Sequence, residues 1–291
     1  MNARAKRTER RRGVRVALGA RDEAMLRALD RFRLATSGDL HRLFFAGRHR
    51  DVLASRLRKL YDAGYLEAHV SDRAAPNVYS LGPEGRAWLR RRGGIAHKPP
   101  RPPWPHHLGV ISVWSRVAVA THQLRGVRLA RFVPEFEVRE QGIGAPFGVV
   151  PDALVELARH RDGQSETVRL LVEVDRGSES IAVIRQKLRT LTGVSIEGAL
   201  LPGWSTFDLV VALDASGAHR EARIRALLTE QWPGPWRVWT EATDLIAELS
   251  ELFGGTEATA AGSRCGSGRD QAVSDGGVTS PVVTGGGYSD E

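Results

Sequence analysis

The chain has 291 residues, with 42 basic and 34 acidic side chains, a formal net charge of +8 and a hydrophobic content of 42%. This length suits about two domains at ~100–200 residues each, and the apolar content excludes disorder throughout. A single cysteine, Cys265, excludes a disulfide framework and cysteine-based zinc fingers. The N-terminus lacks the apolar core of a signal peptide, and no stretch reaches the ~20 uncharged apolar residues of a membrane span, so we expect a cytoplasmic protein.

Charge is distributed unevenly along the chain. Residues 1–100 carry 23 Lys and Arg side chains against 10 Asp and Glu, whereas residues 101–291 carry 19 against 24. A basic first part favours a polyanion as partner, and we expect double-stranded DNA. Composition then predicts five segments: a basic disordered arm at 1–20, domains at 21–92 and 106–253, a proline-rich linker at 93–105 and a glycine-rich disordered tail at 254–291. The arm is equally explained by contact with the polyanion and by solubility alone.

The first domain has the predicted element order of a winged helix-turn-helix. Apolar spacing predicts a helix at 21–33, a short second helix that Gly47 breaks and a third helix at about 48–63, which ends at Gly64. A polar turn between two short apolar runs predicts a hairpin. Its strands lie at 65–70 and 78–81, and a fourth helix begins at Gly82-Pro83 and runs to about residue 92.

The third helix is the predicted DNA-recognition helix. The face opposite its apolar stripe carries Arg48, Ser55 and Lys59, with Asp51 and Arg58 at its flanks. Arg and Lys on such a face can reach guanine edges and phosphates in the major groove. At the tip of the wing, the candidates for backbone or minor-groove contacts are Arg73 and Asn77. A solvated helix face and a winged helix that binds protein remain as alternatives.

The second domain is predicted to contain a mixed sheet with helices on its faces, which makes the whole chain α+β. The predicted elements are a helix at 104–124, a strand at 127–138 bent at Pro134, a hairpin with strands at 149–157 and 168–175 around a polar turn at 159–166, a helix at 179–191, a strand at 207–213, a helix at 218–230, an edge strand at 235–239 and a helix at 240–252.

Three carboxylates lie at the ends of neighbouring predicted strands. Asp152 begins one strand, and Glu173 and Asp175 end its neighbour on one face, because side chains alternate along a strand. Grouped carboxylates repel one another unless a cation lies among them, and their oxygens suit Mg²⁺ or Mn²⁺. The alternatives are that these side chains are simply solvated, or that Asp175 pairs with Arg176 or caps the next helix.

The second domain resembles the PD-(D/E)xK nuclease superfamily. The matching residues are Pro151-Asp152 and Glu173-Val174-Asp175. The resemblance implies a metal-dependent endonuclease in which the Asp and the Glu bind Mg²⁺ and a Lys two residues after the Glu orients water. Asp175 stands at that Lys position here, and the nearest basic substitutes are Arg176 and Lys187, the latter on the following helix. The implied catalytic set is Asp152, Glu173, Asp175 and Lys187, with the three carboxylates as metal ligands.

Residues 21–252 as a whole resemble the replication-relaxation family. The resemblance rests on Leu57–Leu66, Val78–Gly85, His106-His107-Leu108, Val149–Leu154, and Leu171–Gly177 with Lys187-Leu188. It implies DNA-linked work in the replication, relaxation or transfer of plasmid or other mobile-element DNA. A homodimer and the replication or transfer proteins of such an element remain open as partners. In that family Glu-x-Asp-Arg-Gly is usual, so Asp175 is not a local defect.

Two function hypotheses follow. One is a DNA-binding protein whose nuclease-like domain is active or degenerate. The other is a winged-helix transcriptional regulator whose second domain senses a ligand or dimerises. The adjacent residues His106 and His107 point about 100° apart on a helix, so both cannot easily bind one metal, and we expect one to pack and one to be exposed. The carboxylate group separates the hypotheses, because a sensor domain does not require it.

Overall fold

The computed structural model describes residues 10, 13–69, 77–143, 148, 150–161, 163–197 (side chains to 193), 204, 206–213 and 217–254. These residues divide into two compact units, with the boundary between Trp104 and Pro105. Arg73, most of the predicted arm and the predicted tail from residue 255 onward lie outside the described residues. None of the described helices is long and apolar enough to cross a lipid bilayer.

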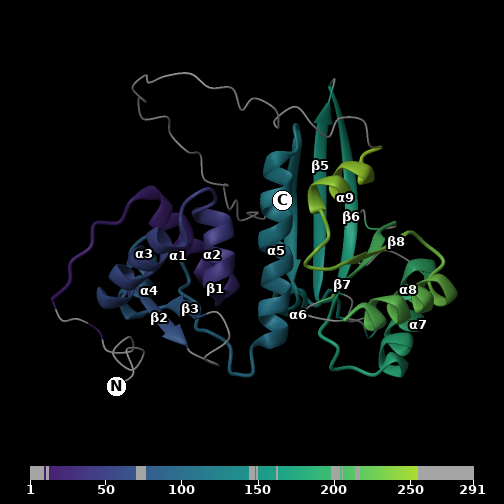
Figure 1. Ribbon diagram of the computed structural model, residues 1–291, viewed down its shortest axis with the longest axis horizontal. Helices are drawn as coiled ribbons and strands as arrows, with labels where there is room; N and C mark the ends of the chain where they lie inside the picture. Colours follow the sequence, from purple (N-terminus) through teal and green to yellow (C-terminus); the bar gives the residue numbers. More distant parts are fainter. Residues whose placement is uncertain are drawn as a thin grey trace. The chain divides into compact units, whose positions relative to one another are not determined.

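The first unit combines helices with a small antiparallel sheet (Figure 1). The strands lie in the order β1-β3-β2. The elements are α1 (Ala20–Phe32), β1 (Ala35–Thr36), α2 (Ser37–Phe44), α3 (Arg50–Asp62), β2 (Leu66–His69), β3 (Val78–Leu81) and α4 (Pro83–Arg90). This is the predicted element order, with one addition: the two-residue strand β1, which pairs with the start of β3 and is too short to give a periodic signal.

Local chemistry explains where these helices begin and end. Thr36 caps α2, because its hydroxyl accepts a hydrogen bond from the Asp39 amide while the Asp39 carboxylate accepts one from the Thr36 amide. Gly64 ends the turn after α3 at a φ of 80°, which favours glycine. A Cβ added to Gly82 would lie 2.2 Å from the carbonyl oxygen of Gly64, so the backbones before β2 and before α4 meet where no side chain fits.

The second unit is built on a five-stranded mixed sheet (Figure 1). In the order β4-β5-β6-β7-β8, the first three strands are antiparallel, while β6, β7 and β8 are parallel. The elements are α5 (Pro105–Gln123), β4 (Val127–Pro134), α6 (Glu135–Glu140), β5 (Ala153–Arg161), β6 (Gln164–Asp175), α7 (Ile181–Glu197), β7 (Asp208–Leu213), α8 (Ala218–Gln231), β8 (Trp236–Trp239) and α9 (Leu245–Leu252). The predicted mixed sheet and the α+β class are confirmed.

Both faces of this sheet are covered. Leu188 of α7 and Ile224 of α8 share one apolar cluster with Leu209 and Val211 of β7. Their neighbour Val210, which points to the opposite face, is also fully buried. The helix α5 packs against β4, β6 and α9. The carboxyl end of β6 therefore emerges from a sheet that is well supported on both sides.

Several predicted boundaries in the second unit were wrong. The strand predicted through Val138 ends at Pro134, and α6 begins at Glu135, because proline lacks a ladder donor and Glu135 gains from the helix dipole and from its ion pair with Arg139.

The turn predicted at 159–166 is mostly strand: Arg159 pairs with Glu166 across β5 and β6, and their side chains form a 2.7 Å ion pair. Polar residues continue this hairpin beyond the apolar core. In addition, α7 extends beyond residue 191, and α9 begins five residues after Thr240.

Candidate functional site

Asp152 connects three elements of the second unit. Its side chain is buried, and its Oδ2 accepts a 2.6 Å hydrogen bond from the backbone amide of Val174 in β6. Its backbone carbonyl accepts a 2.8 Å hydrogen bond from the amide of Glu135 at the start of α6. Asp152 itself directly precedes β5. These bonds fix the carboxylate where the amino end of β5 meets the carboxyl end of β6.

An imidazole and a second carboxylate lie against Asp152. His106, in the first turn of α5, places its Nε2 3.1 Å from Oδ1 of Asp152 and 3.3 Å from Oε2 of Glu135. One ligand atom from each of these three side chains lies within 4.8 Å of the others. The adjacent His107 instead stacks on Phe136, with ring centroids 5.3 Å apart. The two histidines thus have different contacts, but both are half-buried, so the expectation that one of them would be exposed was wrong.

The charges in this cluster shift one another's protonation. The hydrogen bond to Asp152, and then that to Glu135, raises the pKa of His106 to about 10. The hydrogen bond from His106 lowers the pKa of Glu135 to about 2, against the opposing effect of its burial. At neutral pH and without a metal, His106 is therefore an imidazolium held between two carboxylates.

Glu173 and Lys187 lie beside this cluster. Nζ of Lys187, on α7, is 3.7 Å from Oε2 of Glu173 and 3.2 Å from Oε2 of Glu179. Burial raises the pKa of Glu173, and the negative charge of Asp152 adds to the shift. Burial opposes the charge on Lys187, but the carboxylates of Glu173 and Asp152 outweigh it and raise the pKa of Lys187. Of the predicted catalytic residues, the structure thus brings Asp152, Glu173 and Lys187 into one electrostatic group.

Asp175 has a different environment. Its two carboxylate oxygens each accept a 2.8 Å hydrogen bond from Arg220 of α8. Oδ1 also accepts a bond from the amide of Gly177. Arg220 in turn donates to the backbone carbonyl of Glu179. Asp175, which was predicted as a metal ligand, thus has both oxygens hydrogen-bonded to the guanidinium of Arg220. Sequence spacing did not indicate this contact, because Arg220 lies on a helix far along the chain.

The donor set suits a divalent cation. Three side chains offer an imidazole nitrogen and carboxylate oxygens within the reach of a single ion, and Glu173 lies close enough to interact with both His106 and Asp152. The predicted metal ligand Asp152 belongs to this set. The sequence did not predict His106 or Glu135 as ligands. His106 was considered only together with His107 as a pair of ligands for one metal, and Glu135 was assigned to a strand. The available signal for a helix start was the acidic first turn that follows Pro134, with Glu135 and Glu137.

The predicted DNA-recognition residues lie on or next to α3. Arg48 lies in the turn before α3, and Ser55 and Lys59 lie on the helix; all three are exposed. Arg58 forms an ion pair with Asp62 one turn later, at 2.9 Å. Asn77 is half-buried, and its carbonyl accepts a hydrogen bond from the Ser37 amide at the start of α2. Arg73 lies outside the described residues.

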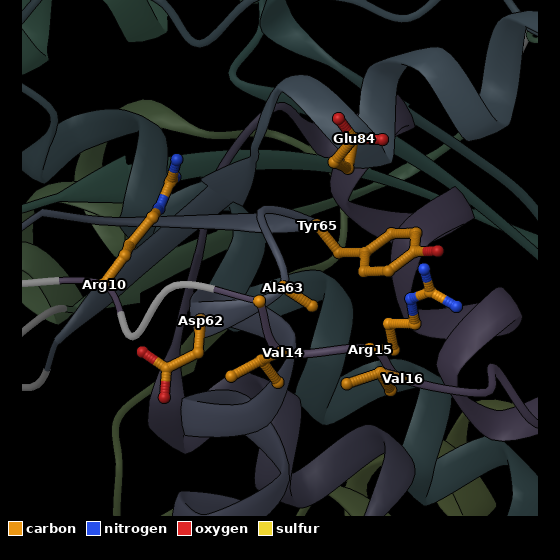
Figure 2. Close-up of a pocket in the computed structure, with 9 residues that line it drawn as sticks. Arg10, Val14, Arg15, Val16, Asp62, Ala63, Tyr65 and Glu84 are labelled. Carbon is orange, nitrogen blue, oxygen red and sulfur yellow. The ribbon is translucent and has the colours of Figure 1, made fainter.

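Two shallow hollows flank α3. One lies on the predicted recognition face and is lined by Arg21, Asp22, Phe45, Asp51, Val52, Ser55, Arg56 and Lys59. Figure 2 shows the other, between Arg10 with residues 13–16 and the turn after α3, with Tyr65 and Glu84 also lining it. There Arg10 donates to the Leu66 carbonyl and lies 5.1 Å from the ring centre of Tyr61. The described part of the predicted arm thus packs against the first unit.

Similarity to a known family extends over both units. Residues 26–194 match a family model described as replication-relaxation, and this match runs from α1 to α7. No curated protein and no solved structure matches the chain. The matched segment is more than half of the 291 residues and contains α3, His106, Asp152, Glu173 and Lys187. The chain therefore belongs to the replication-relaxation family.

Proposed function

We propose that this protein binds double-stranded DNA through its first unit and cleaves DNA phosphodiester bonds with Mg²⁺ or Mn²⁺ at the Asp152 cluster in its second unit. The setting is cytoplasmic, in the replication, relaxation or transfer of plasmid or other mobile-element DNA. The observation that carries the nuclease part is the convergence of Asp152, Glu173 and Lys187, which come from separate parts of the chain.

The cluster has the groups that phosphodiester hydrolysis requires. A bound divalent ion supplies a Lewis acid for the phosphate and lowers the pKa of a coordinated water. Asp152 would hold the ion, because it is buried and fixed by the Val174 amide. Lys187 would stabilise the negative charge of the phosphate, since its ammonium group is half exposed while its neighbours keep it charged. It supplies from α7 the positive charge that the strand lacks at Asp175.

The first unit supports the DNA-binding part through the surface of α3. Arg48 and Lys59 present positive charge, and Ser55 adds a hydroxyl between them. Val52, also on α3, is 48% exposed, and an apolar side chain there can contact a thymine methyl group. Binding through Arg and Lys to phosphates weakens as salt rises, which gives this part of the proposal its own measurement.

Cleavage is tested with supercoiled and linear DNA incubated with Mg²⁺ or Mn²⁺. We expect metal-dependent cleavage by the wild type and its loss in Asp152→Ala and Glu173→Ala. Glu166→Gln is the matched control, because this carboxylate is 49% exposed and pairs with Arg159 outside the cluster. Absence of metal-dependent cleavage, or cleavage that survives both substitutions, would overturn the nuclease proposal.

A second candidate is a DNA-binding regulator without catalytic activity. One observation favours it: the imidazolium of His106 and the guanidinium of Arg139 together balance the charges of Asp152 and Glu135, so the cluster is also explained as a structural ion-pair network. A regulator of this kind would bind DNA with the salt dependence described above and show no metal-dependent cleavage.

A further inference from the structure

We infer that His106, Glu135 and Asp152 form a single-ion site that prefers an imidazole-binding divalent metal, with Mn²⁺ the clearest probe, over Mg²⁺. This inference rests on the proposed function, because it names the ligands of the same cluster. It changes the expected ligand set: an imidazole nitrogen and Glu135 join Asp152, while Asp175 is left out.

Placement of the donors supports one ion. Nε2 of His106, a carboxylate oxygen of Glu135 and one of Asp152 lie within 4.8 Å of one another. Each donor comes from a different position in the fold: the first turn of α5, the first residue of α6 and the residue before β5. Glu135 and Asp152 are also joined through their backbones, so their carboxylates are positioned together. Moderate adjustments of three side chains would bring their ligand atoms to the ~2.0–2.2 Å bonds of a first-row metal.

The second support is charge. Asp152, Glu135, Glu173 and Glu179 have a combined formal charge of −4, and Lys187 and Arg139 supply +2. A divalent cation would neutralise the remaining two charges. Asp152 keeps Oδ1 directed at His106 while Oδ2 is engaged by the Val174 amide, so one oxygen is oriented into the cluster.

Metal preference follows from the nitrogen ligand. Mg²⁺ takes oxygen ligands and keeps much of its water, whereas a nitrogen ligand favours the first-row transition metals, among which Mn²⁺ binds least tightly and Fe²⁺, Ni²⁺ and Zn²⁺ bind imidazole more readily. Three protein ligands leave coordination positions for water or for a phosphate oxygen. The neighbouring histidine does not compete for the ion, because His107 stacks on Phe136.

Asp175 differs from these residues because Arg220 bonds to both of its oxygens. Recruiting it to an ion would break two charge-assisted hydrogen bonds, each stronger than a neutral one. The ligand set Asp152, Glu173 and Asp175 would therefore require α8 to release its guanidinium. In the set His106, Glu135 and Asp152, Arg139 donates only to Oε1 of Glu135, so Oε2 stays directed at His106. A metal would there replace the proton-mediated contacts of His106 without releasing an arginine.

The test is direct binding of Mn²⁺ and Mg²⁺ to the full chain, by titration calorimetry and by the electron paramagnetic resonance signal of free Mn²⁺. We expect one Mn²⁺ per chain, bound at least about tenfold more tightly than Mg²⁺. His106→Ala should weaken Mn²⁺ binding by about tenfold or more, since even outer-shell changes cost 10–100-fold. His107→Ala is the matched control and should keep wild-type affinity. Thermal unfolding of both variants verifies that each is folded.

The outcomes separate this inference from the proposed function. Mn²⁺ binding that depends on His106 but comes with no DNA cleavage would retain the metal site and reject the nuclease. No Mn²⁺ binding at millimolar concentration, equal loss in the His106 and His107 variants, or a preference for Mg²⁺ unaffected by His106→Ala would overturn the site. A further substitution, Glu135→Gln, should reduce Mn²⁺ affinity in the same direction as His106→Ala.

Discussion

The guanidinium of Arg220 donates one hydrogen bond to each carboxylate oxygen of Asp175, both at 2.8 Å, and so joins α8 to the carboxyl end of β6. Both side chains are largely buried, with 17% and 6% of their surfaces exposed. Arg220 also donates to the Glu179 carbonyl, in the connection from β6 to α7. The pair therefore orders the segment that leads from Glu173 to Lys187.

Replacing Arg220 with methionine should destabilise the second unit strongly. The substitution keeps a long apolar side chain but leaves Asp175 buried without its partner, which costs about 3–5 kcal/mol in comparable pairs. Urea unfolding of the two proteins measures the difference. Arg225→Met, on the same helix, is the control, because its ion pair with Glu221 is more exposed and should contribute about 0–1 kcal/mol. Equal losses in the two variants would contradict the role given to the Arg220–Asp175 pair.

Stability of the metal-free protein should fall as the pH rises from about 6.5 to about 10. The pKa of His106 is raised from 6.5 to about 10 in the folded chain, so the folded state holds its proton more tightly than the unfolded state. The stabilisation is complete below pH 6.5 and is lost as His106 deprotonates toward pH 10. Urea midpoints measured in the presence of a chelator should show this decline, and His106→Gln should flatten it. A wild-type midpoint that does not change over this interval would count against the ion pair.

DNA binding should depend on the exposed surface of α3. The double variant Arg48→Ala with Lys59→Ala removes two positive charges that the fold leaves exposed. If both contact phosphates, the slope of log affinity against log salt should decrease in magnitude by about 2, and affinity should fall on all sequences. Fluorescence anisotropy with a labelled duplex measures both quantities. Arg225→Ala, a cation on α8, should leave the slope unchanged; a wild-type slope in the double variant would reject α3 as the DNA-binding helix.

Gly82→Ala should destabilise the first unit. The new Cβ would lie 2.2 Å from the carbonyl oxygen of Gly64, so one of the two backbone segments must move, at a cost of about 1–3 kcal/mol. Gly38→Ala is the control: its Cβ would meet only the Thr36 hydroxyl, at 3.5 Å, and alanine favours the helix by about 0.5–1 kcal/mol. Unfolding of the two variants should therefore change in opposite directions. A neutral Gly82→Ala would show that the contact relaxes without cost.

The periodic elements could be predicted from the sequence because their apolar stripes are long. Helices such as α1 and α8 and strands such as β7 have such stripes. The start of α2 could be predicted for another reason, because Thr36 offers a capping side chain. The misassigned segments lack a long apolar stripe: α6 spans only Glu135–Glu140 and buries only Val138. The outer part of the β5–β6 hairpin is polar on both faces, so alternation gives no signal there, and only pairing across the strands defines it.

The part of the candidate site that could be predicted consists of carboxylates at the ends of adjacent strands. Asp152 and Glu173 come from paired strands, and a resemblance pointed to Lys187. The contributions of His106, Glu135 and Arg220 could not be obtained in this way, because each depends on how a helix packs against the sheet. Arg220 is 45 residues from Asp175 in the chain, and no local pattern indicates their bidentate contact.

The β5–β6 hairpin has a consequence for how this family can vary. Its tip, near Gly163, lies eleven residues from Asp152 and ten from Glu173, or about 35 Å along an extended strand. Added residues at the tip would lengthen a ribbon remote from the carboxylates and leave their spacing intact. A single residue inserted within β6 near Glu173 would instead reverse which face that side chain occupies. Length changes should therefore accumulate at the tip of the hairpin, while its base tolerates none.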